Sequence, residues 1–265
     1  MGELKKRVIA SLCLAPVIAS VFYFLPAKWF FIALMVVSII ALFELITMSG
    51  VKERYLLLFL AMICVIPLYY KLFFFFTGCL LFSPSIFMGY KILKGESKKE
   101  GINEDILKGI CVVFLCVVFV VIPVYYLYLL KETGRALPFI LLLAIWASDI
   151  CAYIFGKKFG KRRLVPNISP KKTYEGLLGA MAGSTVVIVL SGKVLDMGIL
   201  ETVIVGTATG ILAQMGDILE SAGKRLCAAK DSSRLIPGHG GILDRMDSFI
   251  FTAPFLYHYL AGIKV

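Results

Sequence analysis

Residues 108–130 read KGICVVFLCVVFVVIPVYYLYLL, and Lys108 is the one charged side chain among these 23 residues. A helix that crosses the hydrocarbon core of a bilayer needs about 20 mostly apolar residues. Because such a helix bonds its own N–H and C=O groups, it leaves no backbone polar group exposed to lipid. The stretch therefore predicts a transmembrane helix.

Eight further windows share this character, and 60% of the 265 residues are hydrophobic, which is more than a soluble domain needs. The nine windows are residues 8–25, 29–47, 55–70, 72–90, 108–130, 136–155, 176–195, 199–219 and 248–263. The sequence thus predicts an all-α, polytopic integral membrane protein with about nine transmembrane helices. We expect five spans in an N-terminal region, 1–130. A C-terminal region, 131–265, holds two polar loops, 156–175 and 220–247.

The distribution of Lys and Arg predicts the orientation of these spans. If the N-terminus is cytoplasmic and nine spans alternate, 22 of the 28 basic residues fall on the cytoplasmic side, as positive-inside topology requires. Both polar loops then lie on that side. The net charge of +11 fits this topology and attraction to anionic lipid headgroups, and no nucleic-acid partner is expected.

Charged residues are concentrated between positions 217 and 247. The acids are Asp217, Glu220, Asp231, Asp244 and Asp247, and the bases are Lys224, Arg225, Lys230, Arg234 and Arg245. A charge at bilayer depth costs roughly 3 kcal/mol or more, so ten charges require water, mutual pairing, or a bound metal and substrate.

The spacing of the acids favours a site for a hard cation. Asp217, Glu220, Ser221 and Lys224 would share one face if the eighth helix continues past the membrane surface. A short helix after Gly241 would likewise place Asp244 and Asp247 together. Carboxylates are the ligands that Mg²⁺ takes beside phosphates and water, although the same acids could simply pair with the neighbouring bases.

The pattern from Ser221 to Asp247 resembles that of the phosphatidate cytidylyltransferase (CDP-diacylglycerol synthase) family. The matching residues are Ser221, Lys224, Arg225, Lys230, Asp231, Ser233, Pro237, His239, Gly240, Gly241, Asp244, Arg245 and Asp247. Gly223 departs from the pattern, which usually has an apolar residue there. A glycine inside a helix costs up to about 1 kcal/mol relative to alanine, so it could loosen the turn that presents Lys224 and Arg225.

The other polar loop resembles the same family. Residues 169–176 read SPKKTYEG and are similar to its Ser-Pro-x-Lys-Thr-x-Glu-Gly element. Asp149, followed by the Ala152-Tyr153 pair and Gly156, is similar to its Asp-x-x-Ala-Tyr-x-x-Gly element. Seven bases against Glu175 in residues 156–175 suit a triphosphate together with an anionic lipid, although a headgroup-binding basic patch is the simpler interpretation.

The resemblance implies a Mg²⁺-dependent nucleotidyltransferase, with one or two ions, that converts CTP and phosphatidate into CDP-diacylglycerol and pyrophosphate. It also implies a homodimer in the inner (cytoplasmic) membrane, with the active site on the cytoplasmic side. The expected metal ligands are Asp217, Asp231, Asp244 and Asp247. The expected catalytic residues are Lys224, Arg225, Lys230, Asp231, His239 and Arg245. The expected substrate-binding residues are Asp149, Ser169, Lys171, Lys172, Glu175, Ser221, Gly240 and Gly241.

Two acids lie inside apolar windows, where ionisable groups are candidates for function. Asp149 belongs to the region of resemblance, and we expect it in the site. For Glu44 the sequence leaves an interfacial position and a role in the site equally open.

Two other functions compete with the cytidylyltransferase hypothesis. A CTP-dependent kinase of lipid alcohols, of the dolichol- or phytol-kinase type, would use similar acids but transfer the γ-phosphate. A transporter would line a pathway between both faces with its charges, whereas the charges here gather on one side.

Overall fold

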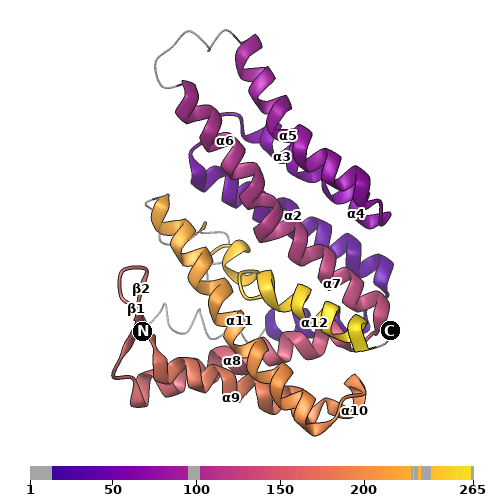
Figure 1. Cartoon of the computed structure of the whole chain (residues 1–265), viewed down its shortest axis with the longest axis vertical. Helices are drawn as coiled ribbons and strands as arrows, with labels where there is room; N and C mark the ends of the chain where they lie inside the picture. Colours follow the sequence, from indigo (N-terminus) through magenta and orange to yellow (C-terminus); the bar gives the residue numbers. More distant parts are fainter. Residues whose placement is uncertain (1–13, 95–101, 228, 230–231, 234–239, 264–265) are drawn as a thin grey trace.

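The computed structural model describes residues 14–94, 102–227, 229, 232–233 and 240–263 (Figure 1). The N-terminal region begins with a helix over Leu14–Phe24. It continues with α2 (Ala27–Ser49), α3 (Arg54–Ile63), α4 (Val65–Tyr69), α5 (Phe73–Leu93), α6 (Ile102–Cys116), η2 (Val117–Val121) and α7 (Ile122–Thr133). The C-terminal region contains α8 (Leu137–Phe159), β1 (Arg163–Val165), β2 (Ser169–Thr173), α9 (Tyr174–Leu190), α10 (Gly192–Leu195), α11 (Ile199–Leu226), η3 (Leu243–Arg245) and α12 (Phe249–Ile263).

The all-α membrane fold predicted from the sequence is confirmed. Among the described residues, five helices are long and apolar enough to cross a membrane: Ala27–Ser49, Phe73–Leu93, Ile106–Thr133, Leu137–Phe159 and Ile199–Leu226. The other windows form the shorter helices Leu14–Phe24, Arg54–Tyr69, Tyr174–Leu190 and Phe249–Ile263. Within the described residues, every apolar window therefore falls on helical segments, while nine crossings and a cytoplasmic N-terminus stay predictions.

The long helix over Ile106–Thr133 contains one irregular segment. Its residues 117–121 are π-helical, and Pro123 follows directly in the first turn of α7. Proline has no N–H to donate to the preceding turn and its ring crowds the carbonyl there, so the local hydrogen-bond ladder has to shift. The helix remains continuous through the bundle because this shift absorbs the proline.

The antiparallel hairpin of β1 and β2 is a departure from the predicted all-helical chain. Arg163 pairs with Thr173, and Val165 pairs with Ser169. The Ile168 N–H donates to the Val165 carbonyl at 3.2 Å, which closes a turn with Pro166 at its second position. Proline fixes the φ angle that this position requires, so a turn signal was present within the basic loop.

Helices α8, α9 and α11 pack against one another at the end of the molecule drawn lowest in Figure 1. Small residues allow this close approach. A Cβ at Gly183 of α9 would lie 2.5 Å from the Ala147 carbonyl oxygen of α8, and one at Gly206 of α11 would lie 2.5 Å from Cα of Thr185. Such contacts stabilise helix pairs in membranes, where apolar burial gives little driving force. The three helices therefore form a firm base for the polar residues they carry.

Two basic residues hold the C-terminal end of the helix Leu14–Phe24. They are Lys131, in the last turn of α7, and Arg135, which follows α7. Buried Lys131 donates to the carbonyls of Phe22 and Tyr23, and Arg135 donates to that of Tyr23 at 3.1 Å. Cations at this end of a helix satisfy its free carbonyls and oppose its dipole. These bonds tie the first described helix to the rest of the bundle.

Candidate active site

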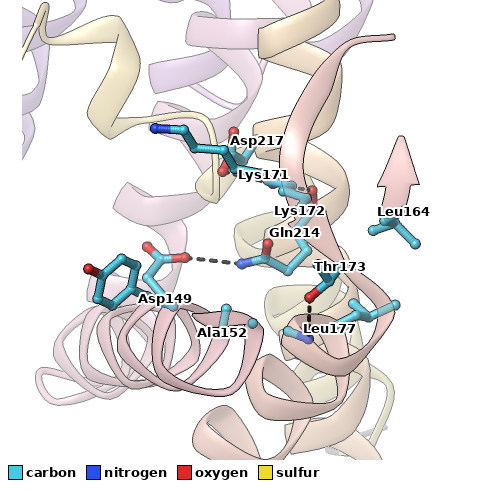
Figure 2. Close-up of a pocket in the computed structure, with 12 residues that line it drawn as sticks. Asp149, Ala152, Leu164, Lys171, Lys172, Thr173, Leu177, Gln214 and Asp217 are labelled. Carbon is cyan, nitrogen blue, oxygen red and sulfur yellow. Dashed lines mark hydrogen bonds and ion pairs between the residues drawn. The ribbon is translucent and has the colours of Figure 1, made fainter. Parts of the chain in front are cut away.

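A polar pocket lies where α8, the hairpin and α11 meet. Figure 2 shows Asp149 of α8, Lys171 and Lys172 of β2, and Gln214 and Asp217 of α11 around it. Two lysines thus face two carboxylates from different elements. A pocket with this balance of charge can bind an anion that brings its own cation.

Direct contacts hold these polar side chains together. Lys172 Nζ lies 2.8 Å from Asp217 Oδ2, and Gln214 Nε2 donates to Asp149 Oδ1 at 3.1 Å. The position of Lys172 depends on the next residue, Thr173, whose hydroxyl accepts the Gly176 N–H at 3.0 Å. Thr173 is therefore the N-cap of α9, and the strand before it ends beside α11.

Three carboxylates converge beside this pocket. Asp217, Glu220 and Asp247 each offer an oxygen atom, and these atoms all lie within 4.8 Å of one another. Asp217 and Glu220 share one face of α11, three residues apart, as the sequence predicted. Asp247 reaches them from the segment between η3 and α12. We call Asp217, Glu220 and Asp247 the carboxylate trio.

Ion pairs from the described residues reach two of the three carboxylates, from Lys172 to Asp217 and from Lys224 to Glu220. The Glu220 side chain is buried, and its Oε1 has no hydrogen-bond partner within the described part of the chain. Burial, together with the charges of Asp217 and Asp149, raises the pKa of Asp247 to about 8. A hard divalent cation would relieve both conditions, and three carboxylates are a donor set that suits Mg²⁺. The residues present therefore fit the cofactor that the sequence led us to expect.

Gly216 allows the third carboxylate to reach the other two. A Cβ at this position would overlap the carbonyl oxygen of Asp247 and would lie 3.4 Å from Cα of Ser248. The backbone at Asp247 thus packs directly against α11, one residue before Asp217. Because Gly216 has no side chain, Asp247 can approach Asp217 and Glu220 closely enough to complete the trio.

Asp244 lies outside the trio and binds Lys224 instead. Lys224 Nζ is 2.7 Å from Asp244 Oδ1 and 2.7 Å from Glu220 Oε2. Burial opposes the ionisation of Asp244, but the bonds from Lys224 and from the Gly241 N–H hold the pKa of this carboxyl below its usual value. Lys224 therefore links Asp244 to the trio as a counter-charge, and direct metal binding by Asp244 stays a prediction.

The short helix expected after Gly241 is a single 3-10 turn, Leu243–Arg245. Because this helical turn ends at Arg245, Asp244 and Asp247 do not share one helix face as expected. Asp244 binds Lys224, whereas Asp247 joins the trio. Gly240 has a φ of 80°, and a Cβ there would meet the Asp244 carboxylate. Glycine is the residue that adopts this conformation without strain.

The remaining residues predicted for the site differ in their surroundings. Ser221 donates to Asp217 Oδ1 at 3.2 Å, and Ser169 lies at the start of β2. The Glu175 carboxylate accepts the N–H groups of Lys161 and Arg162, so it fastens the base of the hairpin.

The two arginines predicted to be catalytic are both exposed. Arg225 Nη1 donates to the Ala229 carbonyl at 3.3 Å, whereas Arg245 lines a second cavity. Lys230, Asp231 and His239 fall outside the described residues.

Gln214, Glu220 and Glu44 were absent from the predicted site. Gln214 lies three residues before Asp217, so helical spacing could have identified it. Glu220 was placed on the same stripe but not among the ligands. Glu44 belongs to a helix distant in sequence, and nothing near it indicated its partners.

The second cavity is mostly apolar and adjoins the same polar residues. Its walls come from the helix Leu14–Phe24, α2, α7, α8 and the start of α12, with Ile18, Phe22 and Leu142 among the lining side chains. Its polar end is formed by Asp149, Asp244, Arg245 and Asp247. Asp149 therefore lines both cavities. Such a shape suits a molecule with an apolar tail and a polar head, and an anionic head would need a cation to offset the three carboxylates.

Known proteins resemble this chain over long stretches of its sequence. The sequence profile of the cytidylyltransferase family matches residues 5–263. A phosphatidate cytidylyltransferase of Synechocystis sp. is 47% identical over 130 residues, which cover 48% of this chain and 44% of that protein. The Bacillus subtilis phosphatidate cytidylyltransferase is 42% identical over 134 residues, 50% of each chain. The uncharacterized Escherichia coli protein YnbB is 38% identical over 205 residues, 74% of this chain and 68% of that protein. The chain spans about half the length of the two curated phosphatidate cytidylyltransferases.

Proposed function

We propose that this chain, which belongs to the cytidylyltransferase family, transfers the cytidylyl group of CTP to phosphatidate and releases pyrophosphate. The observation that carries the proposal is the position of Asp149. This residue lines a polar pocket with two lysines and also an apolar cavity whose polar end holds Arg245 and three carboxylates. A nucleotide triphosphate suits the first cavity and a phospholipid suits the second, so their phosphates would meet beside the carboxylate trio.

The reaction that this arrangement suits is a direct displacement. An oxygen of the phosphatidate phosphate would form a bond to the α-phosphorus of CTP, while the bond from that phosphorus to the pyrophosphate oxygen breaks. The lipid phosphate has a second pKa near about 6, so it is largely dianionic at neutral pH and needs no protein nucleophile. The barrier that remains is repulsion between two anions, which positioning and electrostatic stabilisation overcome.

Basic residues in both cavities would offset the repulsion between the two phosphates. Lys171 and Lys172 of the hairpin would hold phosphates of the nucleotide in the polar pocket. Arg245 would face the lipid phosphate at the polar end of the apolar cavity. Asp217, Glu220 and Asp247 would hold Mg²⁺, which when bound neutralises charge on the reacting phosphates. Lys224 would bridge Glu220 and Asp244 and hold both in place through its two ion pairs.

We place this chemistry at the cytoplasmic face of the inner membrane, with nine spans and a cytoplasmic N-terminus. One group of aromatic rings lies away from the site, as in the contacts of Tyr69 with Phe31 and Tyr128. Phe31 is at the start of α2 and Glu44 is near its end, about 20 Å apart at 1.5 Å per residue. Aromatic residues favour membrane interfaces, which supports a site near the opposite interface. A homodimer also remains part of the proposal.

Lipid analysis with labelled CTP tests the reaction. Purified protein incubated with Mg²⁺, phosphatidate and CTP labelled at the α-phosphate is expected to place that label in the lipid fraction. CTP labelled at the γ-phosphate should release its label as pyrophosphate. Transfer of the γ label to a lipid alcohol would identify a kinase instead. Solute uptake into liposomes without any lipid product would identify a transporter.

The K172M variant is expected to lower kcat/KM for CTP by about tenfold to a hundredfold, because it removes a charge-assisted contact to phosphate, worth about 1.5–3 kcal/mol. Steady-state rates at fixed phosphatidate measure this loss. The matched control is K193M, which removes an exposed lysine of α10. Equal rates for K172M and K193M would contradict the role of Lys172.

A further inference from the structure

We infer that Glu44 is a positioning residue for the proposed reaction: from α2 it fixes the loop that brings Asp244 and Asp247 to α11. This inference rests on the proposed function for its kinetic consequences. Its structural part rests on contacts alone. Glu44 has 5% of its surface exposed and lies in a helix long and apolar enough to cross the membrane. An ionisable group in that setting needs specific partners.

Among the described residues, the donors to Glu44 are Ser232, Ser233, Ile242 and Leu243. Its Oε1 accepts the Ser233 hydroxyl at 2.5 Å and the Ile242 N–H at 3.2 Å. Its Oε2 accepts the Ser232 hydroxyl at 3.2 Å and the Leu243 N–H at 2.9 Å. Each oxygen therefore has two donors, and every one lies nearly 200 positions later in the chain. Charge-assisted bonds of this kind are stronger than bonds between neutral groups.

Gly241 and Ser232 fit closely around this carboxylate. A Cβ at Gly241 would overlap both Glu44 Oε2 and the Ser232 hydroxyl. The Gly241 N–H donates to Asp244 Oδ2 at 2.8 Å, and Ser232 also donates to that oxygen, at 3.1 Å. The loop thus joins two carboxylates, one from α2 and one from its own 3-10 turn. Glycine at 241 leaves room for both.

These bonds lead directly to the residues of the proposed site. Ile242 and Leu243 enter the turn that carries Asp244, which binds Lys224 at 2.7 Å. Two residues beyond that turn, Asp247 joins the trio. Fixing the start of the turn therefore fixes both acids relative to α11. Groups that orient metal ligands from outside commonly contribute about tenfold to a hundredfold to affinity or activity.

Amide hydrogen exchange tests the structural part without any assay of activity. In E44A the amides of Ile242 and Leu243 lose their acceptor, so peptides covering residues 240–247 are expected to exchange at least tenfold faster. E44Q keeps one carbonyl oxygen but places an amide group where the second acceptor was, and an intermediate rate is expected. The matched control is E53Q, which breaks a different buried ion pair, Glu53 with Lys91 at 2.8 Å. E53Q should leave exchange in residues 240–247 unchanged.

Kinetics test the positioning part. E44A is expected to lower kcat by about tenfold to a hundredfold and to raise the Mg²⁺ concentration for half-maximal rate, with E44Q in between. E53Q should change neither constant. Unchanged exchange in E44A, or loosening that E53Q reproduces, would overturn the inference. Failure of the wild-type protein to transfer the cytidylyl group would instead refute the proposed function, and the exchange result would stand by itself.

Discussion

The D217N variant is expected to lower kcat for cytidylyl transfer by about a hundredfold or more, with little change in the KM for phosphatidate. Asp217 contributes to the carboxylate trio, pairs with Lys172 and accepts a hydrogen bond from Ser221. Asparagine has nearly the same shape but no charge, so it weakens the hold on a cation exactly where charge develops in the reaction. Loss of a single electrostatic stabiliser of a transition state typically costs about a hundredfold to a thousandfold.

Steady-state kinetics across a range of Mg²⁺ concentrations measure this effect. A partial recovery of rate at high Mg²⁺ would locate the defect in cation binding. The matched control is D196N, in the exposed turn between α10 and α11, where Asp196 has a φ of 56° that asparagine also tolerates. Full Mg²⁺-dependent turnover by D217N would remove Asp217 from the metal site and with it the assignment of the trio.

The G216A variant is expected to lose most activity although it adds one methyl group. Its Cβ would overlap the Asp247 carbonyl oxygen, so the segment before α12 has to move away from α11. A displacement of about 1 Å at a reacting group can cost about a hundredfold in rate. Overpacking of this kind also destabilises a fold by about 1–3 kcal/mol. We expect a lower melting temperature and a lower kcat together.

The G223A variant is the matched control on the same helix. A Cβ at Gly223 meets nothing within 4 Å of the described structure, so alanine there gains helix propensity of up to about 1 kcal/mol without a clash. Thermal unfolding should therefore shift in opposite directions for the two variants, and G223A should keep its activity. Equal behaviour of both variants would mean that the contact at Gly216 does not fix Asp247. Retained activity in G223A would also show that the departure at Gly223 from the family pattern has little effect on catalysis.

The sequence predicted well where function depends on local spacing. Asp217 and Glu220 lie on one face because they are three residues apart on a helix, and every apolar window became helical. The 3-10 turn at Leu243–Arg245 was not foreseen, because the spacing of Asp244 and Asp247 is equally compatible with an α-helix. Asp244 pairs with Lys224 and accepts the Gly241 N–H, and these contacts keep it outside the trio that Asp247 joins.

Tertiary contacts decided what the sequence left open. Glu44 could be read as an interfacial residue or as part of the site, since its four donors are nearly 200 residues away. Gln214 looked like one polar residue in an apolar helix until Asp149 was found beside it. The hairpin was hidden by its basic composition, although the Pro166 turn marked it. For Glu44 and Gln214, the sequence showed the polar residue but not which distant residue it contacts.

Asp149 lines two cavities, and the second is the more apolar of the two. A hydrophilic substrate in one cavity and a lipid in the other could therefore both reach this carboxylate. The hydrophilic substrate would not have to enter the hydrocarbon core, and the lipid would not have to leave it. Under the proposed reaction, the Asp149 side chain would lie between the nucleotide cavity and the lipid cavity at the point where the new bond forms.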